Sequence, residues 1–361
     1  MTARGLETLV VTSLPNVLYL TNFTGSAAIV VLTHARLLFV TDSRYLTAIE
    51  SARGTTYDCA NLELVVVEGA YDATLSKLLA ALPGARIGFE AAHLTVSRHS
   101  WLSTTLDRLH PAAKELVPTE GVIERLRVRK DPYEVATLRE AARRLSRVAD
   151  GVFAEIRAGQ SEREIALAID WRLRQEGFRK PAFDTIVASG PNAALPHAHP
   201  GERRLAEGDF VVLDFGGVYD SYCVDLTRTV SIGPAGPRAR AVYEAVLEAH
   251  DRAIAAVTPG RSRFEIDQAA RDVLAARGLA DAFGHGTGHG LGIEVHEDPR
   301  IVRRRPDVDT QDEAVQPGMV FTIEPGAYLP DWSGVRIEDD VLVTATGVEV
   351  LTDVTTDLIE I

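Results

Sequence analysis

The sequence predicts an α+β protein with two domains, a mixed α/β domain over residues 1–124 and a second domain over residues 125–361 built from two related halves. Three observations support this prediction. The chain has 361 residues, which is too long for one typical hydrophobic core. Its first third alternates short β-branched runs with helical stretches. Its last part contains a repeated strand pattern that ends in an acidic residue.

The composition is that of a globular protein and excludes several functional classes. Hydrophobic residues make up 46% of the chain and charged residues 25%, unlike a disordered chain. The net charge of -13 argues against a nucleic-acid-binding face, which would be basic. The two cysteines, Cys59 and Cys223, do not indicate a disulfide framework. Neither a signal peptide nor an apolar run of membrane-spanning length is evident, so we expect a cytoplasmic protein without membrane contact.

The first domain is expected to contain several strands and at least one helix. Predicted strands cover residues 9–11, 28–32, 37–40 and 87–89, and a predicted helix covers residues 75–82. Pro83 and Gly84 end that helix. The segment contains no group of residues that suggests catalysis, so we look for the functional site in the second domain.

A domain boundary is expected near residues 126–131, where a basic run precedes a helix start. Asp131 suits the N-cap, Pro132 the first helical position, and Glu134 can complete a capping box. A second helix with the same kind of capping signature begins at Ser161. Beyond these helices the chain changes to strands and glycine-rich turns.

Two segments, residues 208–216 and 318–326, share one pattern. Each has a glycine, five mostly apolar residues, an acid, any residue and a second glycine. Each reads as a buried strand that carries a carboxylate, Asp214 or Glu324, to its C-terminal end. The repeat predicts two related halves that face each other.

Each repeated strand is followed by a turn and by a strand with another acid. A hairpin centred near Tyr219 and Asp220 would place Asp214 opposite Asp225. A hairpin centred at Asp331 would place Glu324 opposite Glu338. Directly opposed residues have Cβ atoms about 5 Å apart, so each pair of carboxylates would repel and would also lose water.

Divalent cations would explain why two such pairs exist. A single acid in one of these positions is more often a solvated turn residue, but four acids in matched positions favour a metal site. Asp339 and Asp340, next to Glu338, are expected to be surface or strand-edge charges.

A glycine-rich segment, residues 284–292, has glycine at every second position. In an extended chain the glycines face one side, where another element can approach closely, and His285, Thr287 and His289 face the other. The glycines disfavour a helical zinc site, and their spacing does not match a phosphate loop. Residues four apart in a strand are about 13 Å apart, so one of the two histidines is expected to bind metal and the other to face substrate.

The combined motifs resemble the metal-dependent peptidases with the "pita-bread" fold, which include prolidase, Xaa-Pro aminopeptidase and methionine aminopeptidase. The motifs are Leu213-Asp-Phe-Gly216, Val224-Asp-Leu-Thr-Arg-Thr229, His285-Gly-Thr-Gly-His289-Gly-Leu-Gly292, Val295-His-Glu297, Thr322-Ile-Glu-Pro-Gly326 and Gly334-Val-Arg-Ile-Glu338. Residues 20–26 and 41–45 resemble a creatinase/prolidase-type N-terminal domain. This additional domain favours the Xaa-Pro branch over methionine aminopeptidase. The resemblance implies a pseudo-twofold catalytic domain after a creatinase-like domain.

The resemblance also implies roles for individual residues. The metal ligands would be Asp214, Asp225, His289, Glu324 and Glu338, with Asp225 and Glu338 bridging two divalent ions. Their oxygen-rich chemistry suits Mn²⁺ and admits Co²⁺ or Zn²⁺. The catalytic and substrate-binding side chains would be Glu324 as proton shuttle, His197, His285 and His296 near the reacting carbonyl, Phe183 against the proline ring, and Arg336.

The expected reaction is hydrolysis of the peptide bond that precedes proline, in a dipeptide or in a longer peptide. The alternatives are a metal-free relative that binds a partner or acts like creatinase, and a methionine aminopeptidase. Longer prolidases use an arginine after the His296 region for the dipeptide carboxylate. Arg303, Arg304 and Arg305 do not align firmly with it, and we expect an exposed charged run there. The resemblance also implies a homodimer.

Overall fold

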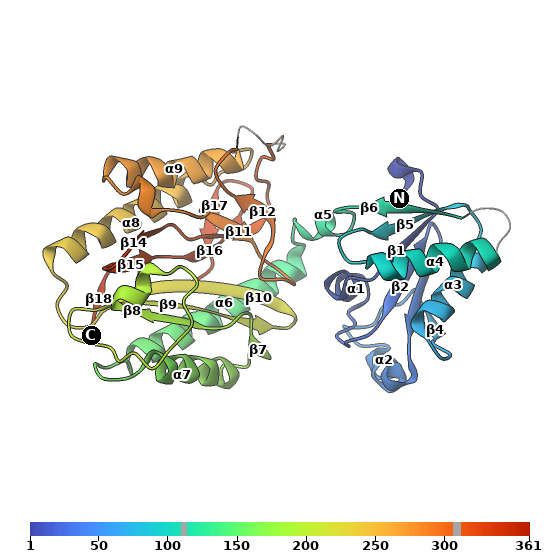
Figure 1. Cartoon of the computed structure of the whole chain (residues 1–361), viewed down its shortest axis with the longest axis horizontal. Coiled ribbons are helices and arrows are strands. Elements are labelled where there is room, and N and C mark those ends of the chain that lie inside the picture. The colour runs from blue at the N-terminus through green and yellow to red at the C-terminus, as the bar shows by residue number, and fades with distance from the viewer. Residues whose placement is uncertain (110–113, 306–311) are drawn as a thin grey trace. The chain divides into compact units, whose positions relative to one another are not determined.

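The computed structural model describes residues 1–109, 114–305 and 312–361, and divides into two compact units (Figure 1). The first unit is Met1–Leu126 and the second is Arg127–Ile361. In the described part of the chain, no helix is both long and apolar enough to span a membrane. The short helix α5 (Glu124–Arg127) contains the division between the units.

The first unit is built on a six-stranded mixed sheet with strand order β4-β3-β2-β1-β5-β6. Its strands are β1 (Thr8–Val11), β2 (Ile29–Thr33), β3 (Leu37–Thr41), β4 (Leu62–Val66), β5 (Arg86–Glu90) and β6 (Glu115–Thr119). Its helices are η1 (Thr2–Arg4), α1 (Leu14–Thr21), η2 (Ser43–Tyr45), α2 (Leu46–Ala52), α3 (Tyr71–Ala81) and α4 (Val96–Leu109). The predicted strands of this unit are confirmed, and so is the predicted helix, which begins earlier than expected, at Tyr71, and ends at Ala81.

Two hydrophobic clusters cover the two faces of this sheet. Leu75 and Leu79 of α3 pack with Leu102 and Leu106 of α4 in one cluster. Val17 of α1 belongs to the other cluster, which covers the opposite residues of the same strands. Alternate residues of a strand point to opposite faces, so both faces of the sheet are apolar and buried.

The second unit consists of two halves, each with a pair of helices followed by antiparallel strands. The first half contains α6 (Pro132–Phe153), α7 (Glu162–Gln175), β7 (Lys180–Pro181), β8 (Ile186–Ser189), η3 (Gly190–Ala194), β9 (Phe210–Tyr219) and β10 (Tyr222–Ser231). The second contains α8 (Pro237–Ala256), α9 (Arg263–Ala276), η4 (Ala280–Ala282), β11 (Gly288–Gly290), β12 (Glu297–Ile301), β13 (Val320–Ile323), β14 (Gly326–Leu329), β15 (Ser333–Arg336), β16 (Asp339–Val343) and β17 (Val348–Val350). The last strand, β18 (Ile359–Glu360), returns to the sheet of the first half and pairs in parallel with β10.

The two helix pairs lie on opposite sides of the strands of this unit (Figure 1). One hydrophobic core joins α6 and α7 to β9 and β10, and another joins α8 and α9 to β13, β15 and β16. The strands between the helix pairs are therefore shielded from solvent on both sides, and a charged group on them loses most of its hydration.

The helix starts predicted from the sequence are confirmed. Asp131 accepts hydrogen bonds from the backbone N–H groups of Tyr133 and Glu134, and Glu134 accepts from the N–H of Asp131. Ser161 and Glu164 form the same reciprocal pair at the start of α7. These capping boxes satisfy N–H groups that the first helical turn leaves without partners.

Candidate metal centre

The hairpin of β9 and β10 turns one residue later than predicted. Tyr219 pairs with Tyr222, and the two turn residues Asp220 and Ser221 have φ values of 44° and 70°. Two left-handed residues are required by a type I′ hairpin turn. No Asn-Gly or Asp-Gly pair marks this turn, so the sequence pattern did not locate its centre.

The shifted register changes the predicted relationship between Asp214 and Asp225. Asp214 lies opposite Thr227, while Asp225 lies opposite Gly216. The prediction that the two acids face each other directly was therefore wrong. Asp225 and Thr227 are two residues apart, so Asp214 and Asp225 still project from the same face of the hairpin as diagonal neighbours.

The second pair of acids has the predicted register. On one side of the two acids Ile323 pairs with Asp339, and on the other side Gly326 pairs with Arg336. The same register, continued between these two strand pairs, places Glu324 opposite the position of Glu338. Asp331, with φ of 62°, is the central residue of the turn, as predicted.

The hairpins from the two halves meet at Thr227 and Glu338. These residues form an isolated antiparallel bridge, in which the backbone N–H of Glu338 donates to the carbonyl of Thr227 at 3.0 Å. The Thr227 hydroxyl donates to Oε2 of Glu338 at 2.5 Å. This junction brings acids from both halves together.

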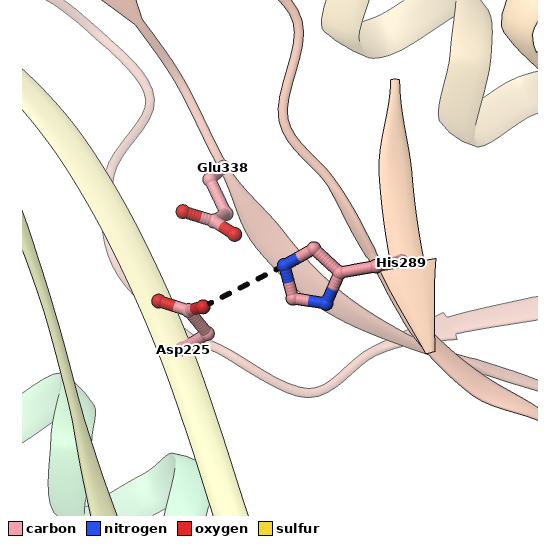
Figure 2. Close-up of side chains that lie close together, drawn as sticks. All are labelled: Asp225, His289 and Glu338. Carbon is pink, nitrogen blue, oxygen red and sulfur yellow. Dashed lines mark ion pairs between the residues drawn. The ribbon is translucent and has the colours of Figure 1, made fainter. Parts of the chain in front are cut away.

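Asp225, His289 and Glu338 form a buried cluster with one ligand atom from each residue within 4.8 Å of the others (Figure 2). Nε2 of His289 lies 3.9 Å from Oδ2 of Asp225 and 3.5 Å from Oε1 of Glu324. Of the two histidines in the glycine-rich segment, His289 is thus the one beside the carboxylates.

The protein holds His289 as a neutral imidazole. Burial and the neighbouring ring of His296 lower the pKa of His289 to about 3. Nδ1 lies 3.1 Å from the carbonyl oxygen of Gly290, which accepts a hydrogen bond from the Nδ1–H group, so Nε2 keeps a free lone pair. A metal-binding histidine must be neutral, and a backbone acceptor on its other nitrogen sets its tautomer.

The carboxylates of the site are destabilised in the absence of cations. Burial, followed by the charges of neighbouring acids, raises the pKa of Asp225 and Glu338 well above the usual values. Burial also raises the pKa of Glu324 to about 7. In the described structure, Oδ1 of Asp214 and Oδ1 of Asp225 are buried without a hydrogen-bond partner. These residues therefore fit divalent cations, which would neutralise the acids and occupy their free oxygens.

Comparison with known proteins agrees with this chemistry. The sequence profile of metallopeptidase family M24 matches residues 136–345, and that of the creatinase/prolidase N-terminal domain matches residues 1–129. The chain belongs to metallopeptidase family M24. Members of this family use divalent metal ions, and the predicted resemblance and fold class are confirmed.

Several relatives resemble this M24 chain over nearly its whole length. The uncharacterised peptidase YqhT of Bacillus subtilis is 36% identical over 98% of this chain and 96% of its own. The structure of an Xaa-Pro dipeptidase from Bacillus anthracis has a TM-score of 0.91 and 36% identity, covering 100% of this chain and 96% of the other. The structure of an X-Pro aminopeptidase from Thermotoga maritima has a TM-score of 0.88 and 31% identity, covering 99% of this chain and 98% of the other.

A buried hydrogen-bonded chain runs from Asp214 to His285 in this M24 site. Nη2 of Arg336 donates to Oδ2 of Asp214 at 2.5 Å, and Nη1 donates to the Tyr328 hydroxyl at 2.6 Å. That hydroxyl lies 2.9 Å from Nε2 of His285. Burial, followed by the charge of Arg336, lowers the pKa of His285 to about 4, so the neutral ring accepts a hydrogen bond from the Tyr328 hydroxyl. Tyr328 was not identified from the sequence, although it lies between the Glu324 and Glu338 motifs.

The other predicted site residues lie around the cluster. The rings of His289 and His296 form an edge contact with centroids 4.3 Å apart, and His296 is exposed. His197 is also exposed, and a positive charge on it would contribute to the lowered pKa values of His285 and His296. Phe183 is half-buried with its ring against Gly216, the residue opposite Asp225. The predicted histidines beside the cluster are therefore partly or fully open to solvent, and Phe183 lies near the strand that carries Asp225.

The glycine-rich segment packs tightly against its neighbours, as its sequence suggested. A Cβ on Gly288 would lie 1.8 Å from the carbonyl oxygen of Thr322, and one on Gly290 would lie 2.2 Å from that of Asp298. The absence of side chains lets β11 fit between β12 and β13. Only residues 288–290 of the segment form a strand.

Asp339 and Asp340 are not surface charges, contrary to the prediction. Both are buried, because β16 lies between β13 and β17 in the interior of the sheet. Oδ2 of Asp340 accepts the backbone N–H of Asp225 at 3.0 Å. The sequence pattern of consecutive acids is typical of an exposed strand end, and only the surrounding strands reveal that both acids are interior.

Arg300 was not identified from the sequence, although it follows the His296 motif by four residues. It lies on β12 in register with His289, and its positive charge contributes to lowering the pKa values of His289, His296 and Glu324. Its side chain is exposed, and no hydrogen bond or ion pair to another described residue occupies its guanidinium. Arg303, Arg304 and Arg305 are exposed, as expected.

Proposed function

We propose that this chain hydrolyses the peptide bond before proline at a centre of two divalent ions. Asp214, Asp225, His289, Glu324 and Glu338 would hold the ions. The observation that carries the proposal is the convergence of four carboxylates and one neutral imidazole, with buried carboxylate oxygens that have no hydrogen-bond partner in the described structure. The metal-free alternative is not favoured, because relatives of that kind lose ligands and all five are present here.

When bound, the ions would supply an acidified water molecule as nucleophile and positive charge for the reacting carbonyl. The protein supplies the proton transfer. Glu324 lies with Oε1 3.5 Å from Nε2 of His289, and its carboxylate can accept a proton from the nucleophile and later donate it. We assign Glu324 the role of proton shuttle from the nucleophile to the leaving proline nitrogen.

The surrounding side chains would bind and orient the peptide. His197 and His296 are exposed beside the cluster, where their N–H groups can hydrogen-bond to the carbonyl oxygen as negative charge develops on it. His285 would support the substrate from the Tyr328 side. Phe183 would form the apolar wall for the proline ring. The guanidinium of Arg336 donates hydrogen bonds to Asp214 and to Tyr328. Arg336 would therefore influence the substrate indirectly, by orienting these two residues.

A second aspect of the specificity is the preferred length of the substrate peptide. Relatives include a Bacillus anthracis protein named Xaa-Pro dipeptidase and a Thermotoga maritima protein named X-Pro aminopeptidase. The guanidinium of Arg300 has no ion-pair partner among the described residues and belongs to the residue paired with His289, which suits the free carboxylate of a dipeptide. We therefore propose that dipeptides with proline in second position are preferred.

The decisive experiment measures kcat/KM of Mn²⁺-loaded protein on Xaa-Pro dipeptides, on matching Xaa-Pro-Yaa tripeptides, and on the same peptides with alanine in place of proline. Faster hydrolysis of the proline dipeptides supports the proposal. Equal rates on the alanine peptides would contradict the proline specificity, and faster cleavage of Met-Ala peptides would favour a methionine aminopeptidase.

Mn²⁺ is the proposed ion, because four carboxylates and one imidazole form a hard, oxygen-rich ligand set. Reconstitution of the metal-free protein with Mn²⁺, Co²⁺ or Zn²⁺, with metal content measured beside activity, tests this choice. We also propose a cytoplasmic homodimer. Sedimentation of the purified protein tests the dimer, and cell fractionation tests the location.

A further inference from the structure

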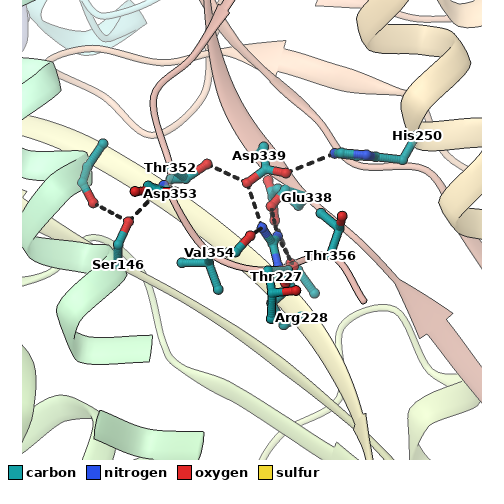
Figure 3. Close-up of polar contacts among 12 residues, drawn as sticks. Ser146, Thr227, Arg228, His250, Glu338, Asp339, Thr352, Asp353, Val354 and Thr356 are labelled. Carbon is teal, nitrogen blue, oxygen red and sulfur yellow. Dashed lines mark hydrogen bonds and ion pairs between the residues drawn. The ribbon is translucent and has the colours of Figure 1, made fainter. Parts of the chain in front are cut away.

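A second buried charged cluster adjoins the proposed metal centre without forming part of it (Figure 3). It consists of Arg228 on β10, Asp339 on β16 and His250 on α8, with exposed fractions of 1%, 1% and 2%. Burial of several charged or polar groups is expensive, and apolar residues of similar size often give equal stability. A contribution to stability alone is therefore a weak explanation for this cluster.

The guanidinium of Arg228 uses every nitrogen in a hydrogen bond. Nη1 donates to the carbonyl oxygens of Glu338 at 2.6 Å and of Thr227 at 3.0 Å. Nη2 donates to Oδ1 of Asp339 at 2.8 Å and to the carbonyl of Val354 at 2.7 Å, and Nε donates to the carbonyl of Thr355 at 2.8 Å. Arg228 thus joins the backbone of Glu338 to the C-terminal segment.

Both carboxylate oxygens of Asp339 have a close polar neighbour. Oδ1 accepts a hydrogen bond from the Thr352 hydroxyl at 2.5 Å, and Oδ2 lies at an ion-pair distance of 3.0 Å from Nε2 of His250. His250 connects this carboxylate to helix α8, while Arg228 comes from the first half of the unit. The cluster therefore links both halves at the strand that carries Glu338.

The peptide groups on both sides of Glu338 are held by this arrangement. Its N–H donates to the carbonyl of Thr227, and its own carbonyl accepts from Arg228. A ligand carboxylate can bridge two ions only when its backbone is placed to within a fraction of an ångström. Outer-shell groups that orient metal ligands contribute about 10–100-fold to metal affinity.

We propose that Arg228, Asp339 and His250 form a positioning network that holds the backbone of Glu338 and thereby sets the affinity of the metal centre for divalent ions. The proposal rests on the metal-binding function proposed above. None of the three side chains needs to touch an ion or the substrate. Their effect reaches the centre through the main chain of Glu338.

The test compares variants at His250 with a matched control on the same helix. His250→Phe keeps the size of the ring but removes the contact with Asp339, whereas His250→Gln retains a side-chain donor. Tyr243→Phe removes another buried hydrogen bond from α8, which the Tyr243 hydroxyl donates to the carbonyl of Thr356 and which involves neither Asp339 nor Glu338. Calorimetric titration of each metal-free protein with Mn²⁺ gives Kd and stoichiometry, and urea unfolding gives stability.

We expect His250→Phe to raise the Kd for Mn²⁺ at least about 10-fold, as outer-shell substitutions do. His250→Gln should recover most of the affinity, and Tyr243→Phe should lose stability with an unchanged Kd. If folded His250→Phe binds Mn²⁺ as tightly as the wild type, the network is only structural and the inference is wrong.

Thr352→Val provides a second, milder variant if His250→Phe does not fold. It removes one hydrogen bond to Asp339 at nearly constant volume. A several-fold rise in Kd supports the network, and an unchanged Kd contradicts it. Absence of Mn²⁺ binding to the wild type would instead refute the proposed function itself, so the two failures are distinguishable.

Discussion

Arg336 and Asp214 form a buried ion pair in which Nη2 lies 2.5 Å from Oδ2, and their side chains are 4% and 13% exposed. Loss of one partner from a buried pair leaves an uncompensated charge and costs about 3–5 kcal/mol. We predict that Arg336→Met lowers the free energy of unfolding of the metal-free protein by that amount. Saturating Mn²⁺ should reduce the loss, because the ions would neutralise Asp214.

Arg139 offers the matched control for this substitution. It pairs with Glu349 at 2.6 Å, but both side chains are more than a third exposed. Arg139→Met should therefore cost less than about 1 kcal/mol. Urea unfolding of both variants, with and without Mn²⁺, checks the prediction, which fails if the two losses are equal.

Glu338 is predicted to be essential for the bridged metal centre. Glu338→Gln preserves size but removes the negative charge and one oxygen ligand. We expect this variant to bind fewer ions per chain. Substitution of residues that only orient a ligand costs up to about 100-fold, so loss of a proposed ligand itself should lower kcat/KM at least about 100-fold. Metal analysis and kinetics of the same preparation provide the measurement. Wild-type turnover by this variant would exclude the two-ion mechanism.

Removal of metal should destabilise the second unit. Ions present at 100 times their Kd stabilise the folded state by about 2.7 kcal/mol. For a unit of this size we expect chelation to lower Tm by about 5–10 °C. Calorimetry with EDTA and with Mn²⁺ measures the shift. Glu338→Gln should show a smaller shift, and an identical shift in both proteins would indicate that the ions act elsewhere.

The glycine at position 288 is predicted to be irreplaceable. A Cβ there would meet the Thr322 carbonyl oxygen at 1.8 Å, so Gly288→Ala must displace β11 from β13. Overpacking of this kind costs about 1–3 kcal/mol, and displacement of His289 should also weaken Mn²⁺ binding. Gly284→Ala is the control, because no atom of the described residues lies within 4 Å of a Cβ at that position. Equal thermal stability and Mn²⁺ affinity in the two variants would contradict the packing argument.

Arg300 is predicted to select the length of the substrate. Hydrogen bonds to charged groups contribute about 1.5–3 kcal/mol, so Arg300→Ala should raise KM for an Xaa-Pro dipeptide about 10–100-fold. KM for a tripeptide amide, whose terminus is uncharged, should change little. Arg303→Ala, another exposed arginine, is the control. Equal effects of Arg300→Ala on both substrates would show that this arginine does not bind the carboxylate.

The sequence by itself determined the local features of this protein. The capping boxes at Asp131 and Ser161 depend only on residues three positions apart, so their helices could be predicted. The glycine spacing indicated close packing around His289, and the turn at Asp331 gave Glu324 and Glu338 the matching positions that they have in the structure. These features follow from short-range backbone preferences and side-chain periodicity.

Only the tertiary structure decided how distant segments share the interior. The left-handed turn at Asp220 and Ser221 set Asp225 diagonal to Asp214, and the strands on both sides of β16 buried Asp339. The pairing of Arg336 with Asp214 likewise joins residues that are 122 positions apart. Burial, and with it the charge state and partner of an acid, depends on which elements cover it, and this information is not contained in the neighbouring sequence.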